Sequence, residues 1–186
     1  MQQMSLIPPP DKEHGGILSL NCRRGRRPLS TKNALHITLR SDFAYGKRSL
    51  LKHRELIKNV TKKSERLFAV RVYRYAINSN HLHFVIRGKY REDLQNFFRV
   101  LAGHIAQQIL LRFPLTQNEL KRQAETQKGH RKNRRKFWAL LLYSRIVSWG
   151  REFQRVLNYV LQNALEALNT IAYQPRKRRK YGRAAP

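Results

Sequence analysis

The first regular pattern along the chain is an alternation of hydrophobic and polar positions over residues 34–40. The apolar side chains from Leu35 to Leu39 fall on one face, while His36 and Thr38 fall on the other. Because successive side chains of a strand point to opposite faces, this pattern predicts a strand with one buried face.

Later segments switch between helical and strand spacing. The clearest helix covers residues 91–113, where apolar residues recur at three- and four-residue intervals and Pro114 ends the pattern. Ser49 and Ser148 stand where helix N-caps are expected. The predicted helices are 49–66, 91–113 and 151–170, and the further predicted strands are 67–76, 81–87 and 137–147. Residues 115–136 are polar and basic and are expected to form a loop or a frayed extension of the second helix.

The order of these elements, β-α-β-β-α-β and then one more helix, indicates an α+β chain with a ferredoxin-like antiparallel sheet. In that plan the first and third strands are central neighbours, and the first two helices cover one face of the sheet. The extra C-terminal helix is then free to cover part of the other face. The predicted domain spans residues 33–171, between a basic, flexible, Pro- and Gly-containing arm over 1–32 and a basic tail over 172–186.

The chain carries a large excess of positive charge. Its 186 residues include 39 Lys and Arg against 11 Asp and Glu, which gives a formal net charge of +28. Such an excess repels itself and favours a polyanionic partner, above all nucleic acid, because each neutralised phosphate releases counterions. An anionic membrane surface is the second candidate, and a merely soluble basic protein is the third.

Cysteine usage and hydropathy narrow the cellular setting. Cys22 is the only cysteine, which excludes an internal disulfide and a cysteine-based zinc site. No apolar run approaches the roughly 20 residues that span a bilayer, and Pro8, Pro9 and Pro10 interrupt the early part of the chain unlike a signal peptide. We therefore expect a protein of a reducing cytoplasm that is not associated with a membrane.

The sharpest local signal is the stretch Asn80-His81-Leu82-His83-Phe84-Val85-Ile86 in the third predicted strand. Its apolar residues at even positions point into the core, so His81 and His83 project together from the opposite face. Two imidazoles on a rigid strand can share one metal ion. The competing interpretation is a half-exposed polar face that binds nothing.

The last predicted helix supplies a matching pair of polar side chains. Tyr159 and Asn163 are four residues apart and therefore share one helical face. If this helix crosses the open face of the sheet, the Asn163 amide oxygen completes a three-ligand set with the histidines, with Gln162 as the rival ligand. Such a set suits Mg²⁺ or Mn²⁺, and Tyr159 would attack the phosphate that the metal polarises. Alternatively, Tyr159 is an amphipathic side chain at a helix–sheet contact.

These motifs together resemble the single-tyrosine HUH transposases. The Asn80–Ile86 stretch looks like their His-hydrophobic-His strand, and Tyr159-Val160-Leu161-Gln162-Asn163 resembles the tyrosine helix of the REP-associated branch. The opening strand Leu35-His36-Ile37-Thr38-Leu39-Arg40 is similar as well, and the resemblance covers roughly residues 33–170. It implies a bacterial, nucleoid-associated DNA transposase in which two histidines and an amide or acidic side chain hold one divalent metal. The tyrosine cuts single-stranded DNA near hairpins, stays linked to the 5′-phosphate and later transfers the strand.

Many cations and several aromatic side chains are candidates for DNA contact, because phosphates pair with Lys or Arg and bases stack on rings. The aromatic candidates are Trp138 with its neighbour Phe137, and Tyr73 and Tyr75. The cationic candidates are Arg23, Arg24, Arg26, Arg27, Arg71, Arg74, Lys128, Arg131, Lys132, Arg134, Arg135, Lys136, Arg176, Lys177, Arg178, Arg179 and Lys180. The alternative for each is a solvated charged surface.

Three functions therefore compete on the sequence alone. The first is an active transposase and single-strand endonuclease, acting as a monomer or a homodimer. The second is an inactive or domesticated relative that only binds single-stranded or hairpin DNA. The third is a basic RNA-binding protein with a ferredoxin-like sheet. The set of His81, His83, Tyr159 and Asn163 favours the first, because the third requires no particular polar residues on that face.

Overall fold

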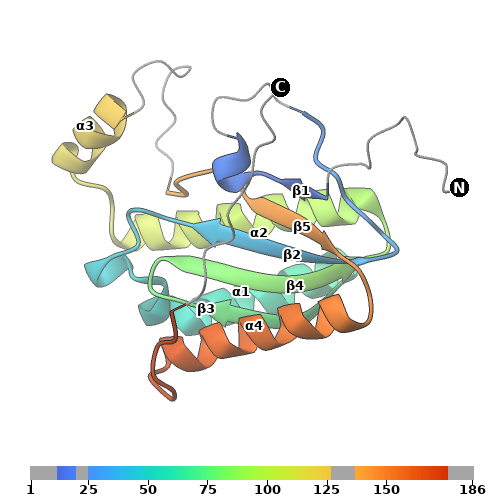
Figure 1. The fold of residues 1–186 in the computed structure, drawn as a ribbon. Coiled ribbons are helices and arrows are strands. Elements are labelled where there is room, and N and C mark those ends of the chain that lie inside the picture. Colours follow the sequence, from blue (N-terminus) through green and yellow to red (C-terminus); the bar gives the residue numbers. More distant parts are fainter. Residues whose placement is uncertain (1–11, 20–24, 127–136, 176–186) are drawn as a thin grey trace, which may run out of the picture.

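The computed structural model describes residues 12–19, 25–126 and 137–175, and its elements follow the predicted order (Figure 1). The chain folds as an α+β protein with one antiparallel sheet. The strands are β1 (Glu13–His14), β2 (Ala34–Arg40), β3 (Val70–Ile77), β4 (His81–Gly88) and β5 (Tyr143–Val147). The helices are α1 (Arg54–Leu67), α2 (Arg91–Arg112), α3 (Gln117–Thr126) and α4 (Arg151–Ala167), with short 3₁₀ turns at Gly16–Ser19, Gly46–Arg48 and Leu50–His53.

The sheet has the order β1-β5-β2-β4-β3. Strands β2 and β4 are central neighbours, as the ferredoxin-like plan predicts, and Thr38 lies directly opposite His83 in their register. On the other side of β2, His36 pairs with Arg145 of β5. Side chains of three separate strands are thereby fixed on one face of the sheet.

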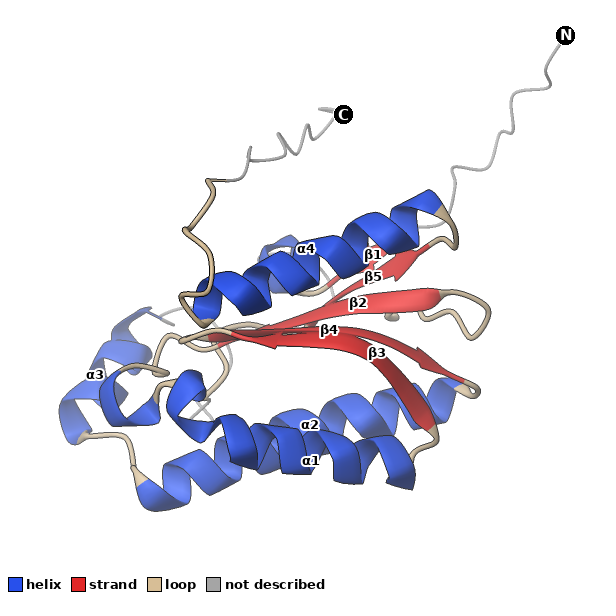
Figure 2. Cartoon of the chain, turned by 90° about the horizontal axis from the view of Figure 1, so that it is seen from below, coloured by secondary structure: helices blue, strands red, loops and turns tan. Residues whose placement is uncertain are grey.

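Helices α1 and α2 cover one face of the sheet, and α4 lies across the other (Figure 2). This three-layer arrangement buries both faces of the central strands β2 and β4 over most of their length. The core under α1 and α2 includes Leu35, Ile37, Leu82, Phe84, Ile86, Leu94, Phe97 and Leu101. The core under α4 is smaller and consists of Ala34, Ala76, Val85, Val147, Phe153, Val156 and Val160.

Two predicted elements differ from the structure. Residues 117–126 form the separate helix α3 where a loop or a frayed extension was expected, because Thr116 and Glu119 make a capping box: each side chain accepts the other's backbone N–H. The strand predicted over 137–147 forms only from Tyr143, because Phe137 and Trp138 both pack toward the α2 layer. Two consecutive residues on one side break the alternation that a strand requires.

The predicted N-caps are also wrong in detail. Ser49 precedes a 3₁₀ turn and its hydroxyl makes no cap bond, while His53 stands at the N-cap of α1. Gly150, not Ser148, is the N-cap residue of α4. The backbone N–H of Ser148 instead donates to Glu152 in the first turn of that helix.

Part of the predicted N-terminal arm is folded against the domain. Glu13 and His14 form a strand that pairs with β5. The Arg27 guanidinium donates to the Ser144 hydroxyl at 2.7 Å and lies 5.8 Å from the centre of the Phe98 ring, and burial lowers its pKa. The pairing of β1 extends the sheet beyond the strands that the ferredoxin-like plan requires, and the Arg27 contacts attach the following segment to the domain.

An ion pair ties α3 to the loop before α1 and makes stability depend on pH. Burial alone would raise the pKa of Glu119, but bonds from Tyr45, Thr116 and Arg48 outweigh it and lower that pKa to about 2. A depressed carboxyl pKa stabilises the fold above its unfolded value near 4.5, and this contribution is lost as the pH falls toward 2. We expect Glu119→Gln to cost about 2 kcal/mol at pH 7 and to flatten the fall of Tm between pH 4.5 and 2.5, measured by circular dichroism. An unchanged acid profile would contradict the role of this carboxylate.

The turn into α4 depends on a glycine. Gly150 has φ +84° and ψ −134°, a backbone conformation that side chains disfavour, although a Cβ there would meet nothing within 4 Å. We expect Gly150→Ala to destabilise the protein by about 1–2 kcal/mol through strain alone, measured by urea denaturation. The matched control is Gly103→Ala inside α2, where a Cβ also meets open space, and it should stabilise by about 0.5–1 kcal/mol. Equal effects of the two substitutions would contradict the strain at Gly150.

Candidate functional site

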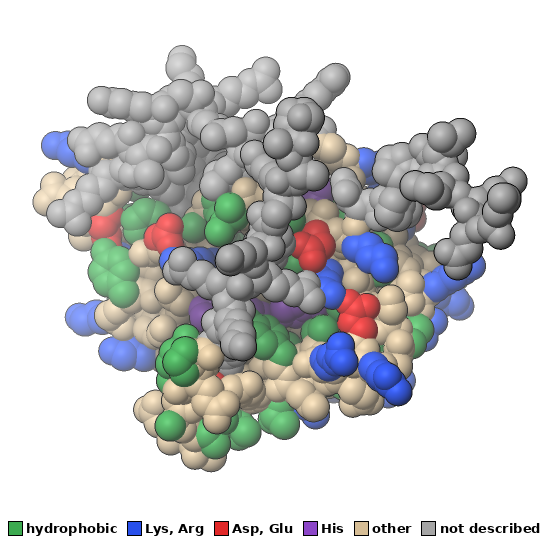
Figure 3. Space-filling view, viewed as in Figure 1, with side chains coloured by type: hydrophobic (Ala, Val, Ile, Leu, Met, Phe, Trp, Pro, Cys, Tyr) green, Lys and Arg blue, Asp and Glu red, His purple; other side chains and the backbone are tan. Residues whose placement is uncertain are grey.

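The face of the sheet beside α4 carries polar side chains from three neighbouring strands, among them the predicted histidine pair. Strand β4 contributes His81 and His83, β2 contributes His36 and Thr38, and β5 contributes Tyr143 and Arg145. Figure 3 shows histidine side chains on this face, next to α4. The side chains of β2 and β4 that alternate with these groups are apolar at the sheet centre, so the alternation along each strand separates the polar face from the core.

His83 lies at the centre of the site and is only 5% exposed. Its Nδ1 is 3.1 Å from the Thr38 hydroxyl and 3.2 Å from Nε2 of His36. The two imidazole rings stack with their centres 5.3 Å apart. These contacts fix the orientation of the His83 ring from the β2 side.

His81 lies next to His83, with ring centres 4.9 Å apart and planes nearly perpendicular. Its Nδ1 is 2.8 Å from the Asn80 side-chain oxygen, and its Nε2 is 3.1 Å from the Asn78 amide nitrogen. The predicted pairing of the two imidazoles on one face is therefore present. The turn residues before β4 hold the His81 ring.

His36 also belongs to the site. The sequence pattern predicted the correct strand face for His36, but no role was predicted for its side chain. It is 9% exposed, and burial together with the charge of Arg145 lowers its pKa to about 4. His36 is consequently neutral at pH 7 and can either donate to or accept from His83. The sequence could have indicated this position of His36, because the expected pairing of the first and third strands puts their polar faces side by side.

Tyr159 approaches this group from α4. Its ring lies edge-on to His83, with centres 5.4 Å apart, and edge-on to His36 at 5.9 Å. The side chain is half-buried, packed against the smaller core. The structure thus brings the predicted nucleophile and one predicted ligand into contact across two elements that are far apart in the sequence.

Asn163 and Gln162 differ in how α4 presents them. Asn163 is 4% exposed, and its amide nitrogen donates to the backbone oxygen of Tyr159 at 2.7 Å. Gln162 is directed along the helix, since its amide nitrogen donates to the Glu166 carboxylate at 2.9 Å. Asn163 thus continues the buried face of α4, whereas the Gln162 amide is bonded to a carboxylate of its own helix.

Arg145 connects the site to neighbouring elements. Its guanidinium pairs with Glu152 at the start of α4 and lies 3.5 Å from the Glu13 carboxylate on β1. Burial would raise the pKa of Glu152, but the Ser148 backbone and Arg145 together lower it. This ion pair links the sheet to the helix that carries Tyr159.

The donor atoms on this face fit a divalent metal ion in their chemistry. Two imidazoles and a buried amide oxygen are ligands that Mn²⁺, and less readily Mg²⁺, accepts. Among the described residues no three His, Cys, Asp or Glu side chains cluster as a metal site, so a third protein ligand would have to be a group of another kind, such as an amide oxygen.

The predicted DNA-contacting cations divide into three groups. Arg26 and Arg71 are exposed, whereas Arg27 is half-buried and Arg74 donates to the backbone oxygen of Leu157 in α4 at 3.1 Å. Trp138 is not an open stacking surface, because its ring packs on the core and its Nε1 donates to the Ala102 oxygen at 2.9 Å. The remaining candidates lie outside the described residues: Arg23, Arg24, Lys128, Arg131, Lys132, Arg134, Arg135, Lys136, Arg176, Lys177, Arg178, Arg179 and Lys180.

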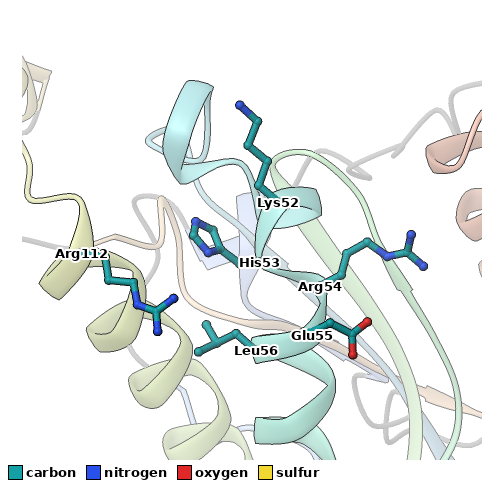
Figure 4. Close-up of a pocket in the computed structure, with 6 residues that line it drawn as sticks. All are labelled: Lys52, His53, Arg54, Glu55, Leu56 and Arg112. Carbon is teal, nitrogen blue, oxygen red and sulfur yellow. The ribbon is translucent and has the colours of Figure 1, made fainter.

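A separate hollow lies among the helices on the far side of the sheet. It is lined by Lys52, His53, Arg54, Glu55, Leu56 and Arg112, at the meeting of α1 and α2 (Figure 4). None of the predicted site residues lines it. In the part of the chain that the structure describes, no helix has both the length and the apolar character that crossing a membrane requires.

Comparison with known proteins adds evidence on the fold. The sequence matches no protein-family model and no curated protein. The structure is similar to a REP-associated tyrosine transposase bound to a REP hairpin, with a TM-score of 0.54 and 11% identity over 78% of this chain and 74% of that one. It is also aligned with a candidate transposase from Deinococcus radiodurans R1, with a TM-score of 0.40 and 11% identity over 76% of this chain and 98% of that one.

The similarity to the first of these structures agrees with the family resemblance of the sequence motifs. A His-hydrophobic-His strand lies at the centre of the sheet, and the tyrosine helix crosses the face to which the histidines point. The fold of this chain is that of the REP-associated tyrosine transposase.

Proposed function

We propose that this protein is a tyrosine transposase that cuts and rejoins single-stranded DNA near hairpins. The observation that supports this most is the position of Tyr159, edge-on to His83 and His36 on the polar face of the sheet. A tyrosine that served only as helix–sheet packing would not need a histidine pair beneath it. The net charge of +28 favours a nucleic-acid substrate.

In the proposed reaction the Tyr159 hydroxyl oxygen attacks the phosphorus of a phosphodiester. A phosphotyrosine bond forms, the bond from phosphorus to the upstream 3′-oxygen breaks, and the phenolic proton is lost to the surroundings while the 3′-oxygen leaves as a hydroxyl. The 5′-phosphate stays on the protein, so the energy of the broken bond is conserved for rejoining. Attack by a 3′-hydroxyl then reverses the step on the same or a new strand.

The chain's own groups prepare this step. His81, His83 and Asn163 would hold one Mg²⁺ or Mn²⁺, and a bound ion supplies polarisation of the phosphate and offsets its developing charge. If His83 coordinates through Nε2, its Nδ1–H donates to Thr38 or to neutral His36, which fixes the ring tautomer. The Arg145–Glu152 pair keeps the start of α4 against the sheet.

The role given to His36 makes a separate prediction. We expect His36→Ala to weaken Mn²⁺ binding about tenfold, because it removes a partner that orients His83. His36→Gln, which can keep a polar group near His83, should recover part of that loss. Isothermal titration with Mn²⁺ measures both. Full affinity in His36→Ala would exclude this orienting role.

The direct experiment incubates the full chain with a labelled, hairpin-bearing single strand and Mg²⁺ or Mn²⁺. We expect a covalent adduct that survives denaturing electrophoresis and retains a label placed downstream of the cut. Tight, salt-sensitive binding without any adduct would contradict the proposal and favour a relative that only binds DNA. Equal binding of RNA without an adduct would favour the RNA-binding interpretation.

A further inference from the structure

Two exposed arginines face each other on the sheet, on the same side as the histidines. Arg71 of β3 and Arg87 of β4 are register partners, and both alternate with the side chains of the α1–α2 core. Like charges directly opposite one another destabilise a sheet. Within the described ranges neither arginine forms an ion pair with a carboxylate, so this arrangement favours an anion that lies between them.

Aromatic rings accompany both arginines. The Arg71 guanidinium lies 4.9 Å from the centre of the Tyr73 ring, and that of Arg87 lies 5.7 Å from Trp149. Trp149 also contacts Tyr73 at 6.0 Å and Phe153 at 4.7 Å, yet it is 43% exposed. We call Arg71, Arg87, Tyr73, Trp149 and Phe153 the Trp149 cluster.

Two exposed members of the cluster, Arg87 and Trp149, are held in place by the backbone before β2. Nε of Arg87 donates to the Thr31 oxygen at 3.3 Å, and Nε1 of Trp149 donates to the Lys32 oxygen at 2.8 Å. An exposed indole that is fixed in this way has already lost much of the side-chain entropy that binding would cost. Preorganisation of this kind is typical of a recognition surface.

We propose that the Trp149 cluster is a second contact site for single-stranded DNA. Arg71 and Arg87 bind one backbone phosphate, and the neighbouring unpaired base stacks on Trp149. Cations beside an exposed ring are the combination that single strands require, since phosphates meet the guanidinium groups and any base has a face to stack. DNA as the ligand rests on the proposed function.

The cluster is placed to continue the track of a strand bound at the histidines. Arg87 follows His83 by four residues on the same face of β4, which corresponds to about 13 Å along the strand. Trp149 precedes α4, the helix that carries Tyr159. Figure 3 shows Lys and Arg side chains, with some Asp and Glu among them, at the right-hand end of the molecule. In the same view, Figure 1 shows that α4 starts at this end.

The test uses tryptophan fluorescence, because Trp138 and Trp149 are the only two tryptophans. In a protein that carries Tyr159→Phe and Trp138→Phe, Trp149 is the single fluorescent reporter. The Tyr159→Phe substitution and added EDTA together prevent any cutting of the DNA. We expect a dT12 oligonucleotide to quench this emission, whereas inorganic polyphosphate competes for binding but quenches little. If the protein with Trp138→Phe does not fold, two other proteins give the same readout. Quenching in the single variant Tyr159→Phe is compared with quenching in the double variant that carries Tyr159→Phe and Trp149→Leu.

Affinity measurements complete the test. We expect Arg71→Gln with Arg87→Gln to weaken dT12 binding about tenfold and to reduce its salt dependence, and Trp149→Leu to weaken it about tenfold. The matched control is Lys62→Gln with Lys63→Gln on α1, which removes the same charge from the other side of the sheet. An effect no larger than that of the control, or binding of dT12 without quenching, would overturn the cluster as a DNA site. Because these assays need no cleavage, they are independent of adduct formation by Tyr159.

Discussion

Tyr159→Phe is expected to abolish the covalent protein–DNA adduct, lowering its rate of formation by at least about a thousandfold. The substitution removes one oxygen atom, the proposed nucleophile, and keeps the ring that contacts His83 and His36. The adduct is measured by denaturing electrophoresis with a labelled single strand. DNA affinity and Tm should stay close to those of the wild type, because the packing of the ring is retained.

Tyr143→Phe is the matched control for that experiment. Tyr143 projects from the same face of the sheet, with its ring edge-on to His36 at 6.4 Å, but it belongs to β5 and not to α4. We expect this variant to form the adduct at a rate within a few-fold of the wild type. Loss of the adduct in Tyr143→Phe together with its survival in Tyr159→Phe would show that Tyr143, and not Tyr159, is the nucleophile.

His81→Ala with His83→Ala is expected to weaken Mn²⁺ binding by about a hundredfold or more and to prevent adduct formation. Loss of an orienting partner alone typically costs 10- to 100-fold in metal affinity, so loss of two ligands should cost at least the upper value. Mn²⁺ affinity is followed by isothermal titration or by the resonance signal of the free ion. Unchanged affinity would exclude this histidine pair as the metal site.

The single variants separate binding from stability. His83 is buried and bonded to Thr38 and His36, so His83→Ala should also cost about 2 kcal/mol of folding free energy. His81 is half-buried and held by turn residues, so His81→Ala should reduce metal affinity with a smaller change in stability. His104→Ala, an exposed histidine on α2, is the matched control and should change neither quantity.

The strand alternation made the sheet and the sides of its strands predictable from sequence. It separated His81 and His83 from the core residues of β4, and the order of elements predicted that β2 and β4 are neighbours. The helical spacing of Tyr159 and Asn163 predicted that both would face the sheet, which the burial of Asn163 and the ring contacts of Tyr159 bear out.

The rest depended on contacts between distant segments, which periodicity does not encode. The contact between His36 and His83 depends on the register of two strands. Trp138 has the sequence context of a stacking residue, but in the structure its indole is bonded to Ala102 of α2. Trp149 and Arg87 were not assigned because they are far apart in sequence and meet only where β4 ends beside the start of α4. The capping box of α3 was readable at Thr116 and Glu119, but the polar composition around it indicated a loop.

The central claim, that Tyr159 is the residue that becomes joined to DNA, is tested most directly by peptide mass spectrometry of the adduct. After nuclease and trypsin digestion, Tyr159 lies in the peptide 156–176 together with Tyr173, while Tyr143 lies in the peptide 137–145. We predict that fragment ions place the nucleotide remnant on Tyr159. A remnant on Tyr173, on Tyr143 or on a residue other than tyrosine would contradict the account.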